Sequence, residues 1–393
     1  MKTDDGKGEI QMQYRELGNT GLRVSEIGMG CEGFSEDGYK NTMRLFNAAE
    51  ELGINYVDLY ASDPEVRASV GRALKGRRQK FIIQSHLCSV WKDGQYKRTR
   101  NPEEVKAGFQ EMMSLLQTDY LDVGMIHYCD SVKDWEKIVN GPVMAYALEL
   151  KKTGVIRHIG LSSHNPEAAL KAVRSGYIEV LMFSVNPCYD LQPAGENVEE
   201  LWKEENYKAH LVNMDPQRQE LYETCQTLGV GITVMKAFGG GDLLDETLSP
   251  AGKALTPHQC LHYALTRPAV ATVLAGAHSV EQLQASASYE EAPEEEKDYA
   301  AAFASFPNIS WEGHCMYCSH CAPCPEKLDV ASITKFLNLA AAQGKVPETV
   351  REHYELLGHY GGDCIRCGAC ETRCPFGVPI MENMKRAEAV FGK

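Results

Sequence analysis

Several features are scarce or missing in this chain of 393 residues, and each absence excludes a class of protein. No apolar run is long enough to cross a bilayer as a helix, which excludes a helical membrane protein. Positive charge is in deficit, with 40 Lys and Arg against 54 Asp and Glu and a formal net charge of −14, which argues against a nucleic-acid partner. The polar first eight residues lack the apolar core of a secretory signal, so we expect a cytoplasmic protein.

Cysteine, by contrast, is abundant, and eight of the 14 cysteines fall into two short runs near the C-terminus. The runs are Cys315-x2-Cys318-x2-Cys321-x2-Cys324-Pro325 and Cys364-x2-Cys367-x2-Cys370-x3-Cys374-Pro375. The second run has the spacing that bacterial ferredoxins use to hold a 4Fe-4S cluster. We therefore predict two 4Fe-4S clusters, and with them chemistry that uses single electrons in a reducing, anaerobic cytoplasm.

The last cysteine of each run is expected to reach across to the other cluster, as in two-cluster ferredoxins. The predicted ligand sets are Cys315, Cys318, Cys321 with Cys374, and Cys364, Cys367, Cys370 with Cys324. Two alternatives remain open. Zinc uses CxxC pairs but usually separates them, and disulfides need an oxidising compartment.

Upstream of the cysteines, short apolar runs alternate with amphipathic helical segments from Leu22 to about Ser288. The predicted strands are Val24–Gly30, Tyr56–Leu59, Phe81–Ser85, Leu121–His127, Ile156–Ser162, Val180–Asn186, Ile232–Ala237 and Ala271–Gly276. Eight such units predict an α/β fold of the (β/α)8 TIM barrel type. A doubly wound open sheet is the alternative, but no GxGxxG follows the first strand.

The acidic segment Glu290–Asp298 and Pro307 mark a boundary between two unequal parts. We predict a polar tail over residues 1–13, a barrel over residues 14–300 and a small, mainly helical domain over residues 301–393. Between the two cysteine runs, apolar residues at helical spacing predict helices at Val330–Ala342 and Pro347–Leu357.

The order and spacing of several segments in the barrel resemble the aldo/keto reductase family, in the branch with a ferredoxin-like C-terminal extension. The matching segments are Tyr14-Arg-Glu-Leu-Gly-Asn-Thr-Gly-Leu-Arg-Val-Ser25 with Ile27-Gly28-Met29-Gly30, Gly71-Arg-Ala-Leu74, Asp119-Tyr-Leu-Asp122 with Ile126-His127, Gly154-Val-Ile-Arg-His-Ile-Gly-Leu-Ser162, Asn186-Pro187, Val234-Met-Lys236, and Gly276 with Glu281-Gln-Leu283. The resemblance covers nearly the whole chain and implies reduction of carbonyls with a nicotinamide hydride.

The family's catalytic Asp, Tyr, Lys and His carry over only in part. The resemblance assigns the Asp to Asp58 and the His to His127, whereas Asp63 stands where the family has Tyr and His86 where it has Lys. Tyr60, two residues beyond Asp58, could point to the same side of the strand and serve as a substitute phenol. We expect His86 and His127 to polarise or protonate the substrate oxygen, with Asp58 orienting His86 and Tyr60 or Asp63 as a second proton source.

The family's nicotinamide site is altered as well. The positions that match its cofactor-binding residues are Ser162, Ser163, Asn186, Lys236, Gly239, Gly240, Gly276 and His278. The glycine turn after the seventh strand suits close approach of a pyrophosphate, with Lys236 nearby. Elsewhere the family's Asn, Gln and basic residues are replaced, so the resemblance leaves NADP(H) binding open.

Three functions follow from these patterns. The first is an iron–sulfur oxidoreductase that couples the two clusters to a small organic substrate at the barrel mouth, with ferredoxin, flavodoxin or another redox protein as partner. The second is an NADPH-dependent carbonyl reductase with auxiliary clusters, and the third is an electron-transfer or docking protein with a silent barrel. The histidines, carboxylates and thiols of the strand ends also leave open a mononuclear metal site at the mouth.

Overall fold

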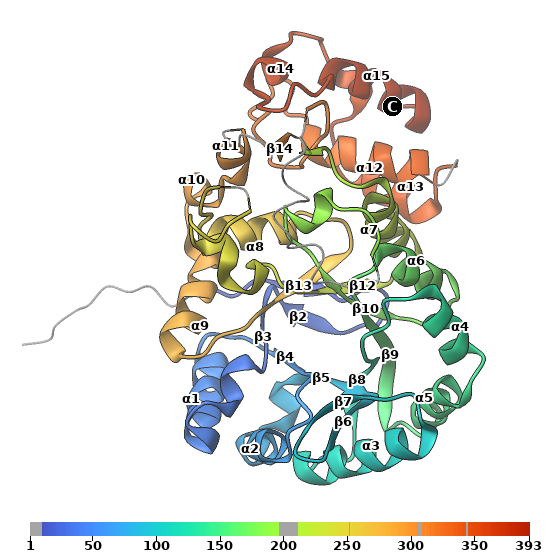
Figure 1. The fold of residues 1–393 in the computed structure, drawn as a ribbon. Coiled ribbons are helices and arrows are strands. Elements are labelled where there is room, and N and C mark those ends of the chain that lie inside the picture. Colours follow the sequence, from blue (N-terminus) through green and yellow to red (C-terminus); the bar gives the residue numbers. More distant parts are fainter. Residues whose placement is uncertain (1–9, 196–210, 251, 305–308, 311, 343–344) are drawn as a thin grey trace, which may run out of the picture.

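The protein is described here by a computed structural model that covers all residues except 1–9, 196–210, 251, 305–308, 311 and 343–344 (Figure 1). Most of the predicted polar tail therefore lies outside the described residues. Eight parallel strands close into a barrel, as predicted. In spatial order they are β10 (Val180–Ser184), β12 (Gly231–Met235), β13 (Val270–Ala275), β3 (Ile27–Met29), β4 (Tyr56–Leu59), β5 (Ile82–Leu87), β8 (Leu121–Ile126) and β9 (Ile156–Ser163).

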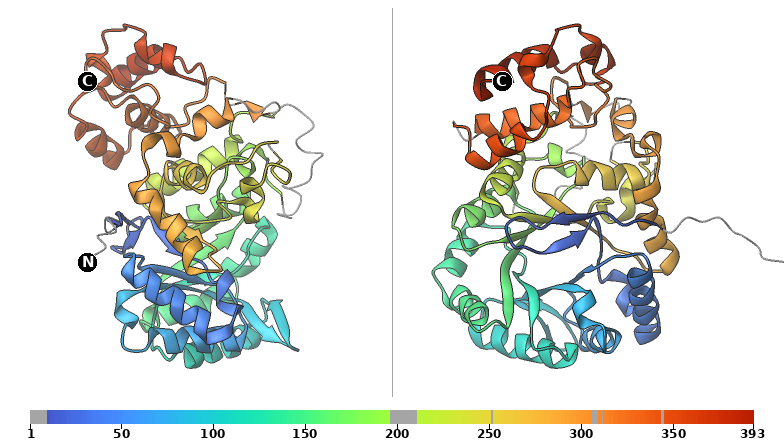
Figure 2. Two further views of the ribbon diagram at one scale, coloured as in Figure 1. Left: turned by 90° about the vertical axis from the view of Figure 1, so that its left-hand side faces the viewer. Right: turned by 180° about the vertical axis from the view of Figure 1, so that it is seen from behind.

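Helices surround this barrel and connect its strands (Figures 1 and 2). They are α1 (Gly38–Glu51), α2 (Pro64–Leu74), α3 (Pro102–Leu116), α4 (Val132–Val139), α5 (Pro142–Lys152), α6 (Pro166–Arg174), α7 (Pro216–Leu228), α8 (Pro257–Leu265) and α9 (Val280–Ala287). Several begin with a proline behind a capping side chain. Asn101, for example, accepts hydrogen bonds from the amides of Glu103 and Glu104, which satisfies donors that a helix start leaves unpaired.

The first predicted strand, Val24–Gly30, is two strands in the structure. Its first half is β2 (Arg23–Ser25), which pairs antiparallel with β1 (Tyr14–Glu16), and its second half is the barrel strand β3. Seen from behind, this hairpin crosses the end of the barrel opposite the mouth (Figure 2). The apolar run is continuous because residues on both sides of Glu26 are buried, so the sequence pattern does not show the break.

A second hairpin was not predicted from the sequence. The chain leaves β5 and forms β6 (Ser89–Lys92) and β7 (Gln95–Arg98), which pair antiparallel before α3 begins. Residues 95–98 are mostly exposed and polar, so they lack the apolar alternation that identifies a strand in the sequence. The hairpin stands at the same end of β5 as His86, and it supplies part of the candidate site.

Beyond the barrel, short helices build a separate C-terminal part. They are α10 (Glu294–Lys297), α11 (Tyr299–Phe303), α12 (Val330–Ala342), α13 (Glu348–Glu355), α14 (Ala369–Arg373) and α15 (Ile380–Phe391), and a two-residue strand β14 (Ile309–Ser310) pairs with β11 (Leu211–Val212). Helix α12 has the predicted bounds and packs against α7 of the barrel and against α15. Among the described residues, no helix is both long and apolar enough to cross a membrane.

A buried arginine attaches this C-terminal part to the barrel. Arg267 follows α8, is 1% exposed, and donates to the carbonyl oxygen of Met316 in the first cysteine run at 2.5 Å. The Tyr299 hydroxyl donates to the same oxygen at 2.6 Å. The first cysteine run is therefore held directly by barrel and linker side chains.

Candidate active site

At the barrel mouth, the carboxylate of Asp58 is buried and its orientation is determined by neighbouring strands. Asp58 lies in β4, and Gln84 of β5 donates from Nε2 to Asp58 Oδ1 at 2.6 Å. The Gln84 Oε1 atom accepts from the hydroxyls of Tyr56 at 2.8 Å and Thr233 at 3.2 Å, so this amide can point only one way. Buried polar groups with complete hydrogen bonding hold rigid positions.

From Asp58, three hydrogen bonds run outward through two histidines to a tyrosine. His86 Nε2 lies 2.9 Å from Asp58 Oδ1, and His86 Nδ1 lies 2.8 Å from His127 Nδ1. His127 Nε2 lies 2.9 Å from the hydroxyl of Tyr96. His86 and His127 are 2% and 7% exposed, whereas Tyr96 is 46% exposed, so the chain leads from the core to solvent. We call Asp58, His86, His127 and Tyr96 the relay.

The relay has two consistent protonation states. With neutral imidazoles, Tyr96 donates to His127, His127 donates to His86, and His86 donates to Asp58. One added proton places imidazolium on His86 beside Asp58, reverses the two outer bonds and frees the Tyr96 hydrogen to point into the mouth. Burial, followed by the charge of His86, holds the pKa of His127 well below its usual range, so the added charge belongs on His86.

Sequence reasoning missed Tyr96. It lies on β7, ten residues beyond His86, and no position in the resemblance corresponds to it. Burial raises the pKa of its phenol, which keeps the hydroxyl protonated at neutral pH. The signal that could have found it is an aromatic residue in an otherwise polar segment between the third barrel strand and the next helix.

Tyr60, the predicted substitute phenol, stands at the mouth but outside the relay. Its side chain is 37% exposed, and its backbone oxygen accepts from the Ser89 hydroxyl at 2.9 Å. Burial, with smaller contributions from Cys31, Glu32 and Asp58, raises its pKa above the ordinary value. Among the described residues its hydroxyl has no hydrogen-bond partner, so nothing returns a proton to it.

The structure places Asp63 away from the position that the resemblance implied. Its side chain is the N-cap of α2 and accepts from the amides of Glu65 at 2.7 Å and Val66 at 3.3 Å. Pro64 occupies the first helical position, as is common behind such a cap. The carboxylate is therefore engaged by the helix start and does not join Asp58 and His86, so the expectation of a proton source at Asp63 is not supported by its contacts.

The side chains that match the family's carboxamide site are already hydrogen-bonded within the protein. The Ser162 hydroxyl accepts from the Tyr128 amide at 2.8 Å, and the Ser163 hydroxyl donates to Asp130 at 3.0 Å. Asn186 donates to the Lys236 carbonyl at 2.9 Å and accepts from the amide of Tyr189 at 2.8 Å. As they stand, these three residues shape the loops after β9 and β10 and offer few groups to a nicotinamide.

The remaining cofactor-site residues lie around the ends of β12 and β13. Gly239, Gly240 and Gly241 all have positive φ, which makes the turn after β12 tight, and Lys236 is exposed beside it. Gly276 follows β13, and a Cβ there would meet the Glu32 side chain at 3.0 Å. His278 contacts Glu36 at 2.5 Å and points toward solvent. This part of the rim has an exposed cation and a backbone turn suited to a phosphate.

The eight cysteines of the two runs gather around two separate hollows in the C-terminal part. Cys315, Cys318, Cys321 and Cys374 line the first hollow, together with Phe376 and Val378. Burial raises the pKa of Cys315 and that of Cys321 to about 12. Both hollows draw their fourth cysteine from the other run, which is the crossed grouping that the ferredoxin spacing predicts.

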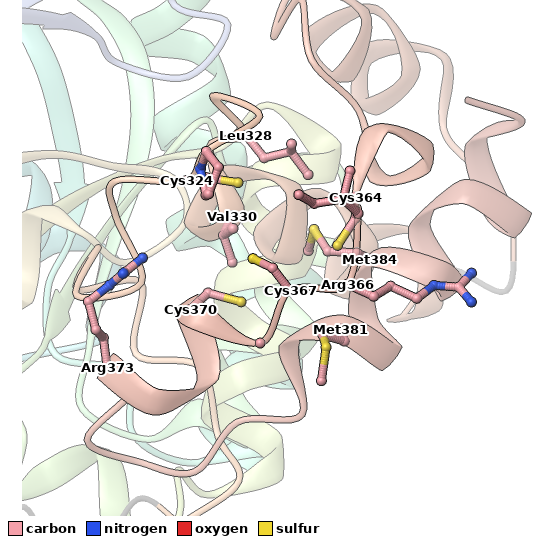
Figure 3. Close-up of a pocket in the computed structure, with 13 residues that line it drawn as sticks. Cys324, Leu328, Val330, Cys364, Arg366, Cys367, Cys370, Arg373, Met381 and Met384 are labelled. Carbon is pink, nitrogen blue, oxygen red and sulfur yellow. The ribbon is translucent and has the colours of Figure 1, made fainter.

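The second hollow is lined by Cys324, Cys364, Cys367 and Cys370 (Figure 3). Figure 3 shows these sulfurs turned toward a common centre, whereas the guanidinium group of Arg366 points away from it. The Arg373 guanidinium donates to the carbonyl oxygens of Cys321 at 2.5 Å and Pro323 at 2.8 Å. Met381, Met384, Leu328 and Val330 supply apolar neighbours. No disulfide links any described cysteine.

In the part of the chain that the structure describes, no three His, Cys, Asp or Glu side chains are arranged to hold a single metal ion. The histidines of the mouth are bonded to one another and to carboxylates instead. The alternative of a mononuclear metal at the mouth is therefore not supported by the arrangement of these side chains.

Comparison with known proteins shows what this barrel is similar to. The sequence model of the Aldo/keto reductase family matches residues 26–257, which ends before the first cysteine run. The uncharacterized oxidoreductase YqkF of Bacillus subtilis is 30% identical over 290 residues, which are 70% of this chain and 89% of that protein. L-galactose dehydrogenase of Arabidopsis thaliana is 25% identical over 310 residues, 70% of this chain and 86% of that enzyme.

Among solved structures, the holo form of the aldo-keto reductase AKR11C1 from Bacillus halodurans has a TM-score of 0.58 at 26% identity. The match covers 73% of this chain and 94% of that one. The shared part is thus close to a complete relative, and about a quarter of this chain lies outside it. By its family match, its barrel and its relatives, the chain belongs to the aldo/keto reductase family.

Proposed function

We propose that this oxidoreductase of aldo/keto reductase type reduces a small carbonyl substrate at the barrel mouth and that Tyr96 is its proton donor. The observation that carries the proposal is the unbroken relay from Asp58 through both histidines to Tyr96, with distances of 2.9, 2.8 and 2.9 Å. General acids must reach the substrate oxygen and must recover their proton after each turnover. Tyr96 meets both needs, because it is half exposed and bonded to His127.

The proton steps follow from the two states of the relay. The carbonyl carbon accepts two electrons with one hydrogen, and the oxygen takes the Tyr96 hydroxyl proton. His127 Nε2 returns a proton to Tyr96, and His86 Nδ1 returns one to His127. His86 ends neutral and still donates to Asp58, whose carboxylate had favoured the imidazolium before the reaction. Solvent reprotonates the relay through the exposed tyrosine.

The hydride source proposed here is NAD(P)H, which the family typically uses. A bound nicotinamide supplies a hydride to the carbonyl carbon. Lys236 and the Gly239–Gly241 turn fit the pyrophosphate of such a cofactor. The hydrogen bonds within the protein at Ser162, Ser163 and Asn186 do not fit the family's way of holding the carboxamide, so these three residues take no part in the proposed reaction.

Two matched phenol variants test the proposal. Tyr96→Phe removes the hydroxyl from the relay and should lower kcat by about 10²- to 10⁴-fold, the usual contribution of a positioned general acid. Tyr60→Phe removes the other phenol of the mouth and should change kcat by only about twofold. Steady-state kinetics with a panel of aldehydes and NADPH measures both. A large loss in Tyr60→Phe with none in Tyr96→Phe would transfer the role to Tyr60.

We propose in addition that the two cysteine hollows hold 4Fe-4S clusters that deliver or accept single electrons. This is supported by the eight sulfurs, which form two groups of four in the crossed pattern, around hollows with apolar neighbours. Buried thiols with raised pKa values deprotonate when they bind a metal, so a cationic iron cluster would compensate their thiolates. The net charge of −14 suits a redox partner with a basic docking face.

Anaerobic turnover separates this second role from simple carbonyl reduction. If the clusters deliver electrons to the substrate at the barrel mouth, a reduced one-electron donor should sustain substrate reduction without NADPH. The double substitution Cys364→Ser with Cys370→Ser should abolish this reduction. Cys260→Ser, a buried cysteine of α8 outside both hollows, is the control and should retain it. Turnover with NADPH alone that survives the paired substitutions would leave the clusters with an auxiliary role.

A further inference from the structure

On the side of the barrel opposite the mouth, a cavity of about 450 Å³ lies between the barrel and the C-terminal part. Its walls come from β1, from the end of α7, from the loops before β12 and β13, and from α12 and α13. The volume falls within the range of small-molecule pockets. Neither the proposed relay nor either cysteine hollow contributes a residue to it.

Three cations of different origin line this cavity: Arg15 of β1, Arg267 behind α8 and Lys335 of α12. Arg15 is paired with Glu26 at 2.6 Å. Among the described residues, Arg267 and Lys335 have no carboxylate within ion-pair distance. Arg267 is buried and Lys335 is partly buried. Cations withdrawn from water are normally paired because an uncompensated charge is costly, so these two indicate a site for an anion.

The hydrogen bonds of Arg267 also indicate a site for an anion. Its Nε and Nη2 atoms donate to Tyr263, Thr266, Tyr299 and Met316, but its buried Nη1 atom has no partner among the described residues. The carboxylate of Asp190 lies 3.6 Å from the buried Arg218 and accepts from the hydroxyls of Tyr222 and Tyr263. Its charge also acts on Arg267, but from beyond ion-pair distance, so the Arg267 guanidinium shares this carboxylate with Arg218 and has none in direct contact.

Lys335 lies close enough to Arg15 and Arg267 for their charges to affect its pKa. Burial, followed by the charges of Arg15 and Arg267, lowers the pKa of Lys335 to about 8. The one carboxylate that lines the cavity among the described residues, Glu16, is exposed and forms no ion pair with Lys335 or Arg267. Beside the cations, the rings of Phe336 and His353 stack at 6.3 Å and give the cavity a flat wall.

We propose that this cavity is a binding site for a small molecule that carries an oxyanion group, phosphate or carboxylate, held by Lys335 and Arg267. The oxyanion supplies the missing counter-charge and accepts hydrogen bonds from the ammonium group. The bound molecule touches both the barrel and α12, so it stabilises the contact between the two parts. This site is independent of the proposed carbonyl reduction and of its cofactor.

Isothermal titration calorimetry of the full chain tests the site with three probes: inorganic phosphate, ADP and citrate, against sodium chloride at equal ionic strength. At least one probe should bind with a Kd of about 1 mM or tighter. If ADP or phosphate binds and citrate does not, the site is a phosphate site. If citrate binds and neither ADP nor phosphate does, it is a carboxylate site. The proposal is wrong if none of the three gives binding heat above that of chloride.

Charge variants at Lys335 locate the binding. Lys335→Gln should weaken the active probe about tenfold or more, because a charge-assisted hydrogen bond is lost. Lys335→Arg should restore most of the affinity, and the exposed Lys345→Gln and Lys385→Gln should leave it unchanged. The melting temperature of each variant without probe shows that it is folded. Equal affinities in Lys335→Gln and Lys345→Gln would overturn the assignment.

Discussion

The barrel mouth and the cysteine hollows both bury reactive side chains, but they satisfy them in opposite ways. At the mouth, every member from Gln84 to Tyr96 has a hydrogen-bond partner supplied by the protein. In the hollows, four sulfurs face one another in each group, and burial raises the pKa of several of their thiols.

This difference indicates where each region takes its stability from. The relay is supported by strands of a closed barrel with an extensive apolar core, so it is complete without any added group. The cysteine hollows are enclosed by short helices and loops, of which α14 has five residues. The apolar core of this part, formed where α12 packs against α15 with Ile333, Leu337 and Met384 buried, is small beside that of the barrel. Small parts of this kind usually depend on a bound metal group.

Removing iron should therefore have the largest effect, and only on the C-terminal part. Binding of a structural metal contributes on the order of 10 kcal/mol in small metal-dependent domains. We expect chelation of anaerobically purified protein to remove the helical signal of α12–α15 and to expose that part to protease, while the barrel stays folded. Circular dichroism and limited proteolysis, read against iron content, measure this.

The matched control for that experiment is Cys260→Ala, which alters a buried cysteine of α8 and should keep its iron. Cys370→Ser, in contrast, should lose iron from the second hollow without chelator. If the C-terminal helices and their protease resistance survive complete loss of iron, this part folds without a metal group and the comparison with the barrel fails.

At the mouth, Asp58→Asn should have the next largest effect, on activity and not on folding. The amide no longer stabilises imidazolium on His86, so kcat should fall by about 10²- to 10³-fold. Steady-state kinetics at neutral pH measures this loss, with the exposed Asp93→Asn on the β6–β7 hairpin as control. An unchanged kcat in Asp58→Asn would exclude the relay as the proton source.

The smallest expected effect is a loss of barrel stability in acid. Burial lowers the pKa of His262 to about 4, below its unfolded value of about 6.5. Between these values the unfolded state binds more protons, so this stability is complete above about pH 7.5 and is lost as the pH falls toward 4. The loss should amount to about 1–3 kcal/mol.

Urea unfolding between neutral and acid pH measures this loss. His262→Gln should flatten the pH dependence, whereas His258→Gln, on the same helix, should not. Burial also lowers the pKa of His314 to about 4, at the start of the C-terminal part. In iron-free protein only the His262 contribution should remain. If the free energy of unfolding depends on pH equally in His262→Gln and in the original protein, this histidine is not a source of acid sensitivity.

Much of the fold was predictable from local pattern. Strand β4 and helix α12 have the predicted bounds, because apolar periodicity is encoded within a few residues. The division of Val24–Gly30 at Glu26 was not predictable, since both halves are apolar and only their partners differ. The β6–β7 hairpin was missed because its second strand is polar and exposed.

The sequence by itself determined the eight cysteines at ligand spacing, the alternation of strands and helices, and the loss of the family's Tyr and Lys at Asp63 and His86. Tertiary structure alone decided that Asp63 caps a helix, that Tyr96 completes the relay, and that Arg15, Arg267 and Lys335 line one cavity. The physical reason is distance along the chain. Spacing and periodicity act over a few residues, whereas these contacts join segments that only barrel closure and docking of the C-terminal part bring together.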